Sequence, residues 1–163
     1  MTEKPRAAEP ESLAMIEKRR IEAAMLKHVY DTVKAARGEE EARRTVADAV
    51  RRSSIEQARE MAAAVGGNTS LQTFVHRQGL WTMGGALTTE TVERTDTRYA
   101  FKVTACKYAE MYREMGLGDI GHLLSCQRDG TFCEGYDPKL KLTRTQTIMQ
   151  GADHCDFDYR YEA

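Results

Sequence analysis

Two side chains near the end of the chain, Arg144 and Cys155, are of types that can do chemistry together. They lie in two segments, 139–148 and 154–161, whose apolar and polar residues alternate as they do in β-strands. Since successive side chains of a strand point to opposite faces, both residues fall on the more apolar face of their segments. The pattern predicts that a guanidinium and a thiol share the inner face of a closing hairpin.

The register of this hairpin follows from matching its two apolar faces. The match places Arg144 opposite Phe157 and Gln146 opposite Cys155. We therefore expect these four side chains to lie within reach of one another, with Arg144 largely buried.

A buried Arg144 needs an anionic partner, because an unpaired charge inside a protein is costly. The partner can be a protein carboxylate, for which Asp129, Glu110 and Glu134 are candidates. It can also be the carboxylate of a substrate, held by two parallel hydrogen bonds. The residues alone leave both interpretations open.

Cys155 also has two interpretations. A lone cysteine is most often a small apolar core residue. It can instead be a nucleophile, if the charge of Arg144 or of the adjacent His154 favours the thiolate. The sequence favours the structural role and leaves the catalytic one open.

A third group precedes the hairpin and consists of His122, Cys126, Asp129 and Cys133. The spacing of three or four residues places them along one face of a helix. Together with Cys155 they can supply metal ligands, or they can be an ordinary helix face. Because the spacing matches no closed zinc pattern and contains no CxxC pair, we expect neither a metal nor another cofactor.

Helical and strand periodicities predict the scaffold that positions these residues. Residues 1–10 are expected to form a flexible arm, and residues 11–163 a single domain. The segment 71–81 suits either a short helix or a strand. The other predicted elements are helices over 11–37, 39–65, 105–115 and 118–135, the last interrupted at Asp129-Gly130, and strands over 87–94, 98–104, 139–148 and 154–161.

This order of elements contains no strand–helix–strand alternation. The predicted fold class is therefore α+β, with N-terminal helices and a mostly antiparallel sheet of two hairpins that is covered by helices on one face.

The charge balance limits the classes of partner. Lys plus Arg number 24 and Asp plus Glu number 25, a net charge of −1, so we expect no nucleic-acid partner and no attraction to an anionic membrane. No apolar leader follows Met1, and no run approaches the ~20 apolar residues of a membrane span, which predicts a cytoplasmic protein. In that compartment the four cysteines are expected to form no disulfide. Whether the chain forms a homodimer stays open.

Several motifs of the C-terminal half resemble the L-2-amino-thiazoline-4-carboxylic acid hydrolase family. The likeness covers about residues 85–161, and the N-terminal helices are compatible with it. The motifs are Lys141-Leu142-Thr143-Arg144-Thr145-Gln146-Thr147, Gly151, Cys155-Asp156-Phe157, Cys126 with Asp129, and Val103-Thr104-Ala105-Cys106 before Tyr108-Ala109-Glu110.

The resemblance implies hydrolysis of a carbon–nitrogen or carbon–sulfur bond in a small cyclic amidine-like carboxylate, on a route to L-cysteine. The reaction needs a nucleophile, a proton donor and a carboxylate clamp. Arg144 suits the clamp; either Cys155 or a water activated by Asp129 suits the nucleophile, and Asp129 or His122 can relay protons. The predicted catalytic residues are Cys155, Asp129 and Cys126, and the predicted substrate-binding residues are Arg144, His122, Gln146 and Phe157.

A second resemblance gives an alternative of another class. The ending Gly151…Cys155-Asp156-Phe157 is also similar to 4-vinyl reductase domains, which implies a non-catalytic module that binds or senses a small molecule.

Overall fold

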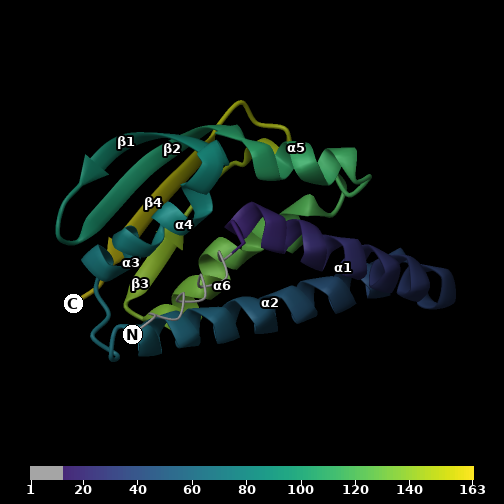
Figure 1. The fold of residues 1–163 in the computed structure, drawn as a ribbon, viewed down its shortest axis with the longest axis horizontal. Helices are drawn as coiled ribbons and strands as arrows, with labels where there is room; N and C mark the ends of the chain where they lie inside the picture. Colours follow the sequence, from purple (N-terminus) through teal and green to yellow (C-terminus); the bar gives the residue numbers. More distant parts are fainter. Residues whose placement is uncertain (1–12) are drawn as a thin grey trace, which may run out of the picture.

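The computed structural model describes residues 13–163, so the predicted arm and the start of the predicted first helix lie outside the described residues. Two long helices, α1 (Met15–Arg37) and α2 (Glu39–Ala64), form an antiparallel pair (Figure 1). Gly38 joins them with a φ of 90°, a conformation that glycine adopts without strain. The predicted end of the first helix at residue 37 is confirmed.

Four strands form one antiparallel sheet in the order β1-β2-β4-β3. The strands are β1 (Leu87–Arg94), β2 (Arg98–Cys106), β3 (Leu140–Thr143) and β4 (Cys155–Tyr161). β1 pairs with β2 in the first hairpin, and β3 pairs with β4 in the second. The pairing of β2 with β4 joins the two hairpins. The predicted α+β class with an antiparallel sheet is confirmed.

The second half of the predicted strand 139–148 is wrong. β3 pairs with β4 in the predicted register, as Leu142 opposite Tyr159 shows, but the pairing ends at Thr143. Beyond it, the side chain of Asp156 accepts hydrogen bonds from the backbone N–H groups of Thr145 and Gln146, both at 2.9 Å. This carboxylate replaces the backbone partners that β4 would otherwise supply, so the chain leaves the sheet.

The undecided segment 71–81 is helical. It forms α3 (Leu71–Arg77) and α4 (Gly79–Thr82), followed by a short 3₁₀ turn, Met83–Gly85. Ser70 caps the start of α3. Its side-chain oxygen accepts the backbone N–H of Thr73, and the side-chain oxygen of Thr73 accepts the backbone N–H of Ser70.

Two helices connect the hairpins. They are α5 (Lys107–Glu114) and α6 (Gln127–Tyr136), with a π-helical segment, His122–Cys126, before α6. The predicted interruption at Asp129-Gly130 is wrong, since both residues lie inside α6. The irregular turn lies earlier, in the π-helical segment.

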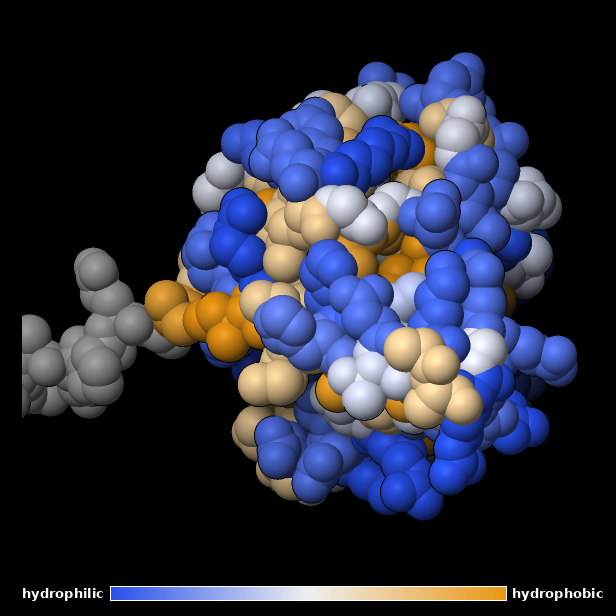
Figure 2. Space-filling model, turned by 90° about the vertical axis from the view of Figure 1, so that its right-hand side faces the viewer, coloured by the Kyte–Doolittle hydropathy of each residue, from blue (hydrophilic) through white to orange (hydrophobic). Residues whose placement is uncertain are grey.

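The helices cover the inner face of the sheet (Figure 1). One hydrophobic cluster packs α1, α2 and α5 together, and a second packs α3 and α6 against β2 and β4. The end of the molecule seen in Figure 2 is mostly hydrophilic, with apolar residues showing between charged ones. No helix among residues 13–163 is both long and apolar enough to cross a membrane.

Gly135 sets the distance between α2 and α6. A Cβ atom at this position would lie 2.4 Å from the backbone oxygen of Ile55 and 2.9 Å from the Cβ of Ala58. The two helices therefore approach each other at Gly135 with no room for a side chain between them.

We expect Gly135→Ala to lower the free energy of unfolding by about 1–3 kcal/mol, because α6 must move away from α2. Gly130→Ala on the same helix is the matched control, since its Cβ would meet nothing within 4 Å and alanine favours helix. Urea unfolding of both variants measures the effect. Equal stabilities would show that this contact does not set the helix spacing.

Candidate functional site

A cavity of about 320 Å3 lies between the inner face of the sheet and the helices α1, α3, α4 and α6. One part of its wall is aromatic and includes Phe74, Trp81, Phe101, Tyr108, Phe132 and Tyr159. Another part is polar and includes Arg19, Gln57, Ser125, Arg128, Asp129 and Arg144. The cavity thus suits a small molecule that has an apolar ring and a charged group.

The exposed lining residues mark where the cavity reaches the surface. Gly79 on α4 and Thr89 and Arg94 on β1 line it and are exposed. The aromatic residues behind them are buried or half-buried. The cavity therefore reaches the surface between α4 and β1.

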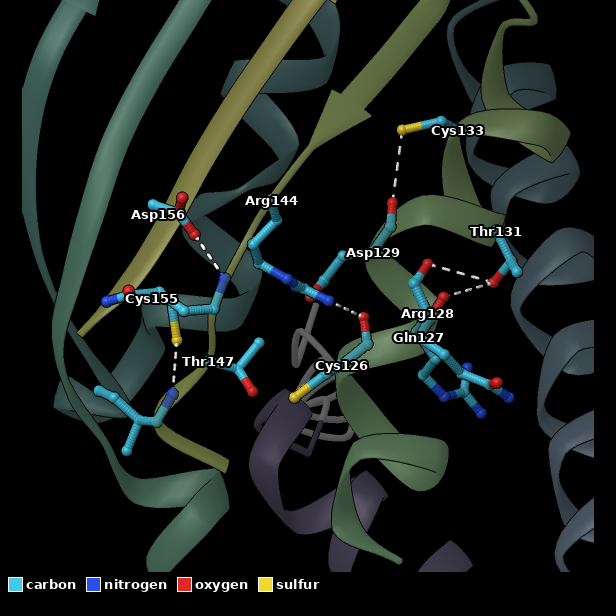
Figure 3. Close-up of polar contacts among 12 residues, drawn as sticks. Cys126, Gln127, Arg128, Asp129, Thr131, Cys133, Arg144, Thr147, Cys155 and Asp156 are labelled. Atoms are coloured by element: carbon cyan, nitrogen blue, oxygen red, sulfur yellow. Dashed lines mark hydrogen bonds and ion pairs between the residues drawn. The ribbon is translucent and has the colours of Figure 1, made fainter. Parts of the chain in front are cut away.

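Arg144 extends from the end of β3 across to α6 (Figure 3). Its Nη1 donates to Oδ2 of Asp129 at 2.6 Å, and its Nη2 donates to the backbone oxygen of Cys126 at 2.9 Å. The guanidinium carbon lies 5.0 Å from the ring centre of Phe157, close enough for a cation–π contact. Of the three candidate protein carboxylates, Asp129 is the one that pairs with Arg144. As expected, the Arg144 side chain is largely buried, 15% exposed, and lines the same cavity as Cys155.

Asp129 has the properties of a proton acceptor. Burial raises the pKa of its carboxyl group, and the charge and hydrogen bond of Arg144 oppose that rise. Oδ2 is held by Arg144, whereas Oδ1 hydrogen-bonds to no side chain or backbone group within residues 13–163. Because Asp129 lines the cavity, this second oxygen can accept a proton from a molecule bound there.

Cys155 begins β4 and is 6% exposed. Its Sγ accepts the backbone N–H of Ile148 at 3.2 Å. Burial raises the pKa of the thiol, and the Ile148 N–H and the charge of Arg144 only partly offset this. His154 does not assist, since its ring contacts Gln146 and Asp153 instead. The thiol is thus held mainly in its protonated form at neutral pH.

The other thiols are also held as neutral groups. Burial raises the pKa of Cys126 to about 12 and that of Cys106 to about 11. Cys133 lies outside the cavity and its thiol donates to the backbone oxygen of Asp129. All four cysteines are free, and no group of three or more metal-ligating side chains occurs within the described part of the chain.

The predicted site residues divide into two groups. Cys126, Asp129, Arg144, Cys155 and Phe157 line the cavity together.

His122 and Gln146 do not line it. His122 lies in the π-helical segment before α6, and burial together with the charge of nearby Arg43 lowers its pKa. The amide of Gln146 points to His154, because the chain has left the sheet before residue 146. The predicted pairing of Gln146 with Cys155 is wrong; the strand partner of Cys155 is Val103.

Two buried arginines of the cavity, Arg19 and Arg128, are absent from the predicted site. Arg19 is 3% exposed although it stands in a basic run, and Arg128 is 6% exposed. The helical phase carried a signal for Arg19, because it falls in line with Met15 and Ala23, four residues away on either side, and both are buried.

A sequence comparison identifies the family. The family model described as L-2-amino-thiazoline-4-carboxylic acid hydrolase matches residues 18–159, nearly the whole chain. The chain belongs to the L-2-amino-thiazoline-4-carboxylic acid hydrolase family. For this family member, comparison with curated proteins gives no significant match.

Two solved structures share the fold of this family member. The phenol-responsive sensory domain of the transcription activator PoxR, with phenol, has a TM-score of 0.53 at 14% identity, over 88% of this chain and 74% of that one. A trafficking protein particle complex subunit 3 from Naegleria fowleri, covalently bound to palmitic acid, has a TM-score of 0.52 at 8% identity, over 90% of this chain and 96% of that one. These likenesses show the fold alone.

Proposed function

We propose that the protein hydrolyses the ring of a small cyclic amidine-like carboxylate of the 2-aminothiazoline-4-carboxylate type. The observation that carries the proposal is the Asp129–Arg144 pair, which leaves one carboxylate oxygen available inside a cavity of ligand size. Membership of a hydrolase family supports the reaction class.

The proposed nucleophile is water. Oδ1 of Asp129 takes a proton from a water molecule as the water oxygen forms a bond to the ring carbon that lies between nitrogen and sulfur. The same carboxyl group then returns the proton to the ring nitrogen or sulfur as that atom leaves. The ring opens and one water molecule is consumed.

Arg144 acts on this step through Asp129. Its hydrogen bond to Oδ2 orients the carboxylate of Asp129, and its hydrogen bond to the backbone oxygen of Cys126 holds the start of α6 near the end of β3. Because Nη1 is already paired with Asp129, a substrate carboxylate at Arg144 would compete with a contact of 2.6 Å. The proposed role of Arg144 is therefore to position the base, and the carboxylate clamp predicted for it is the weaker of the two interpretations.

Cys155 is proposed to shape the cavity wall. A thiol whose pKa is raised is a poor nucleophile at neutral pH. We expect Cys155→Ala to keep kcat/KM within about tenfold of the wild-type value, with a modest loss of stability because the Ile148 N–H loses its acceptor. Steady-state kinetics measure this. A fall of about a thousandfold would identify the thiol as the nucleophile.

Mass spectrometry tests the proposed activity. Purified protein is incubated with 2-aminothiazoline-4-carboxylate and with related cyclic amidines, and the ring-opened product is sought at one water mass above the substrate. The expected result is catalytic turnover by the wild type and turnover about 10²- to 10⁴-fold slower by Asp129→Asn. Absence of turnover on every ring would reject the hydrolase proposal.

A non-catalytic ligand-binding module is the second candidate. The aromatic wall of the cavity favours it, and so does the fold likeness to the phenol-responsive sensory domain of PoxR. In that case ring compounds bind with a measurable heat in calorimetry and are recovered unchanged.

A further inference from the structure

Arg19 and Arg128 meet at the polar end of the cavity from two different helices. Arg19 on α1 donates from Nη1 to both carboxylate oxygens of Glu22, each at 2.8 Å, and from Nη2 to Gln57 at 2.9 Å. Arg128 on α6 donates from Nη2 to Glu22 at 3.3 Å and to Ser53 at 3.1 Å. Both guanidinium groups line the cavity and share one carboxylate, which is itself 40% exposed.

This end of the cavity has an excess of positive charge. Among the described residues that line the cavity, Arg19, Arg128 and Arg144 lie on this side and Asp129 is the one carboxylate, whereas a fourth arginine, Arg94, lies at the surface opening. Asp129 is already paired with Arg144, and Glu22 is divided between Arg19 and Arg128. Burial and the charge of Arg19 lower the pKa of Arg128 to about 10. A further anion at this position would relieve that repulsion.

Arg128 also has unused donors. Its Nε is buried and has no hydrogen-bond partner among residues 13–163, and Nη1 donates to none of them either. A buried donor without a partner costs about 1–3 kcal/mol, more for a charged group, so native proteins rarely keep one. The side chain of Arg128 lines the cavity in which a ligand would bind.

We propose that Arg19 and Arg128 form the subsite that binds the carboxylate of the ligand, with the ring of the ligand against the aromatic wall. Arg128 supplies the direct contact through Nη1, which has no partner among residues 13–163, and Arg19 adds charge. The inference deepens the proposed function, on which it rests for calling this ligand the substrate. It names the substrate class as a monocarboxylate on a small ring, with the carboxylate at the end of the cavity that Arg19 and Arg128 line.

The aromatic wall supports the ring part of this class. Phe132 lies on α6 with Arg128, and its ring is 5.5 Å from that of Trp81 in an edge-to-face arrangement. Trp81 in turn belongs to α4, at the side where the cavity reaches the surface. A ring bound against Trp81 and Phe132 therefore lies beside the helix that carries Arg128.

Calorimetry with benzoate and benzamide tests the subsite, because the two probes have similar shape and differ in charge. We expect the wild type to bind benzoate at least about tenfold more tightly than benzamide. Arg128→Lys should weaken benzoate binding about ten- to a hundredfold and leave benzamide binding unchanged. Arg44→Lys is the matched control, since Arg44 is 68% exposed on α2, and should change neither.

A second variant gives an effect of opposite sign. Glu22→Gln removes the carboxylate that Arg19 and Arg128 share, so benzoate should bind at least about threefold more tightly, which loss of packing alone does not produce. This variant decides the case if Arg128→Lys does not fold. Equal affinity for both probes, or benzoate affinity that neither variant changes, would overturn the subsite. Because no turnover is needed, a failure of the hydrolase proposal leaves this result unaffected, and the reverse also holds.

Discussion

Asp129→Asn is expected to lower kcat/KM for ring hydrolysis by about 10²- to 10⁴-fold, the usual contribution of a positioned general base. Asparagine keeps an oxygen that can accept Nη1 of Arg144, so the fold should be retained. Glu134→Gln is the matched control on α6. Glu134 is 51% exposed and pairs with Arg51 at the surface, so its loss should change neither the rate nor, by more than about 1 kcal/mol, the stability.

The pH dependence of kcat/KM in the wild type should also report Asp129 as the base. Since burial raises the pKa of Asp129, the carboxyl group stays protonated to a higher pH than an ordinary aspartate. The value of kcat/KM should therefore rise with pH through this elevated pKa and then level off. If kcat/KM of the wild type instead rises at the ordinary pKa of an aspartate carboxyl group, Asp129 is not the base.

The raised pKa of Asp129 also affects the stability of the fold, whether or not a substrate is present. A carboxyl group whose pKa is raised in the folded state favours folding below its unfolded pKa and loses that contribution as pH rises through the folded one. Across this window the unfolding free energy of the wild type should fall with pH relative to that of Asp129→Asn. Urea titrations at a series of pH values measure the difference.

The second large effect concerns Arg144. We expect Arg144→Lys to lower kcat/KM about ten- to a hundredfold, because lysine cannot hold Asp129 and the Cys126 backbone oxygen with one planar group. The loss should be equal for a substrate with the ring carboxylate and for its carboxamide, since Arg144 acts through Asp129. The variant should lower kcat and leave KM nearly unchanged.

A different pattern would restore the role that the sequence suggested. If Arg144→Lys impairs the carboxylate substrate alone and spares the carboxamide, Arg144 is the clamp. Measuring Arg128→Lys with the same pair of substrates completes the comparison, because the carboxylate-specific loss is expected there.

Periodicity predicted most of the fold. The helices α1 and α2, the strands β1 and β2 and the register of β3 with β4 follow from local patterns that the structure retains. The end of β3 was not predictable in this way. It depends on the side chain of Asp156, which accepts the backbone N–H groups of Thr145 and Gln146, eleven and ten residues earlier in the chain.

Strand parity also brought Arg144, Cys155 and Phe157 together correctly, because parity acts within one hairpin. The partner of Arg144 and the two further arginines depend on contacts between elements distant in sequence. Arg128 contacts Glu22 across 106 residues, and Arg19 contacts Gln57 across 38. Charged residues on helices usually face solvent, so composition alone conceals such buried arginines.

A single-turnover experiment in water enriched in oxygen-18 tests the central claim most directly. Protein is placed in excess over 2-aminothiazoline-4-carboxylate, and the masses of the product and of the intact protein are measured by mass spectrometry. If Asp129 activates water, the ring-opened product carries one oxygen-18 atom and the protein mass stays unchanged throughout the reaction. Substrate recovered intact after long incubation, or a transient adduct on Cys155, would contradict the account.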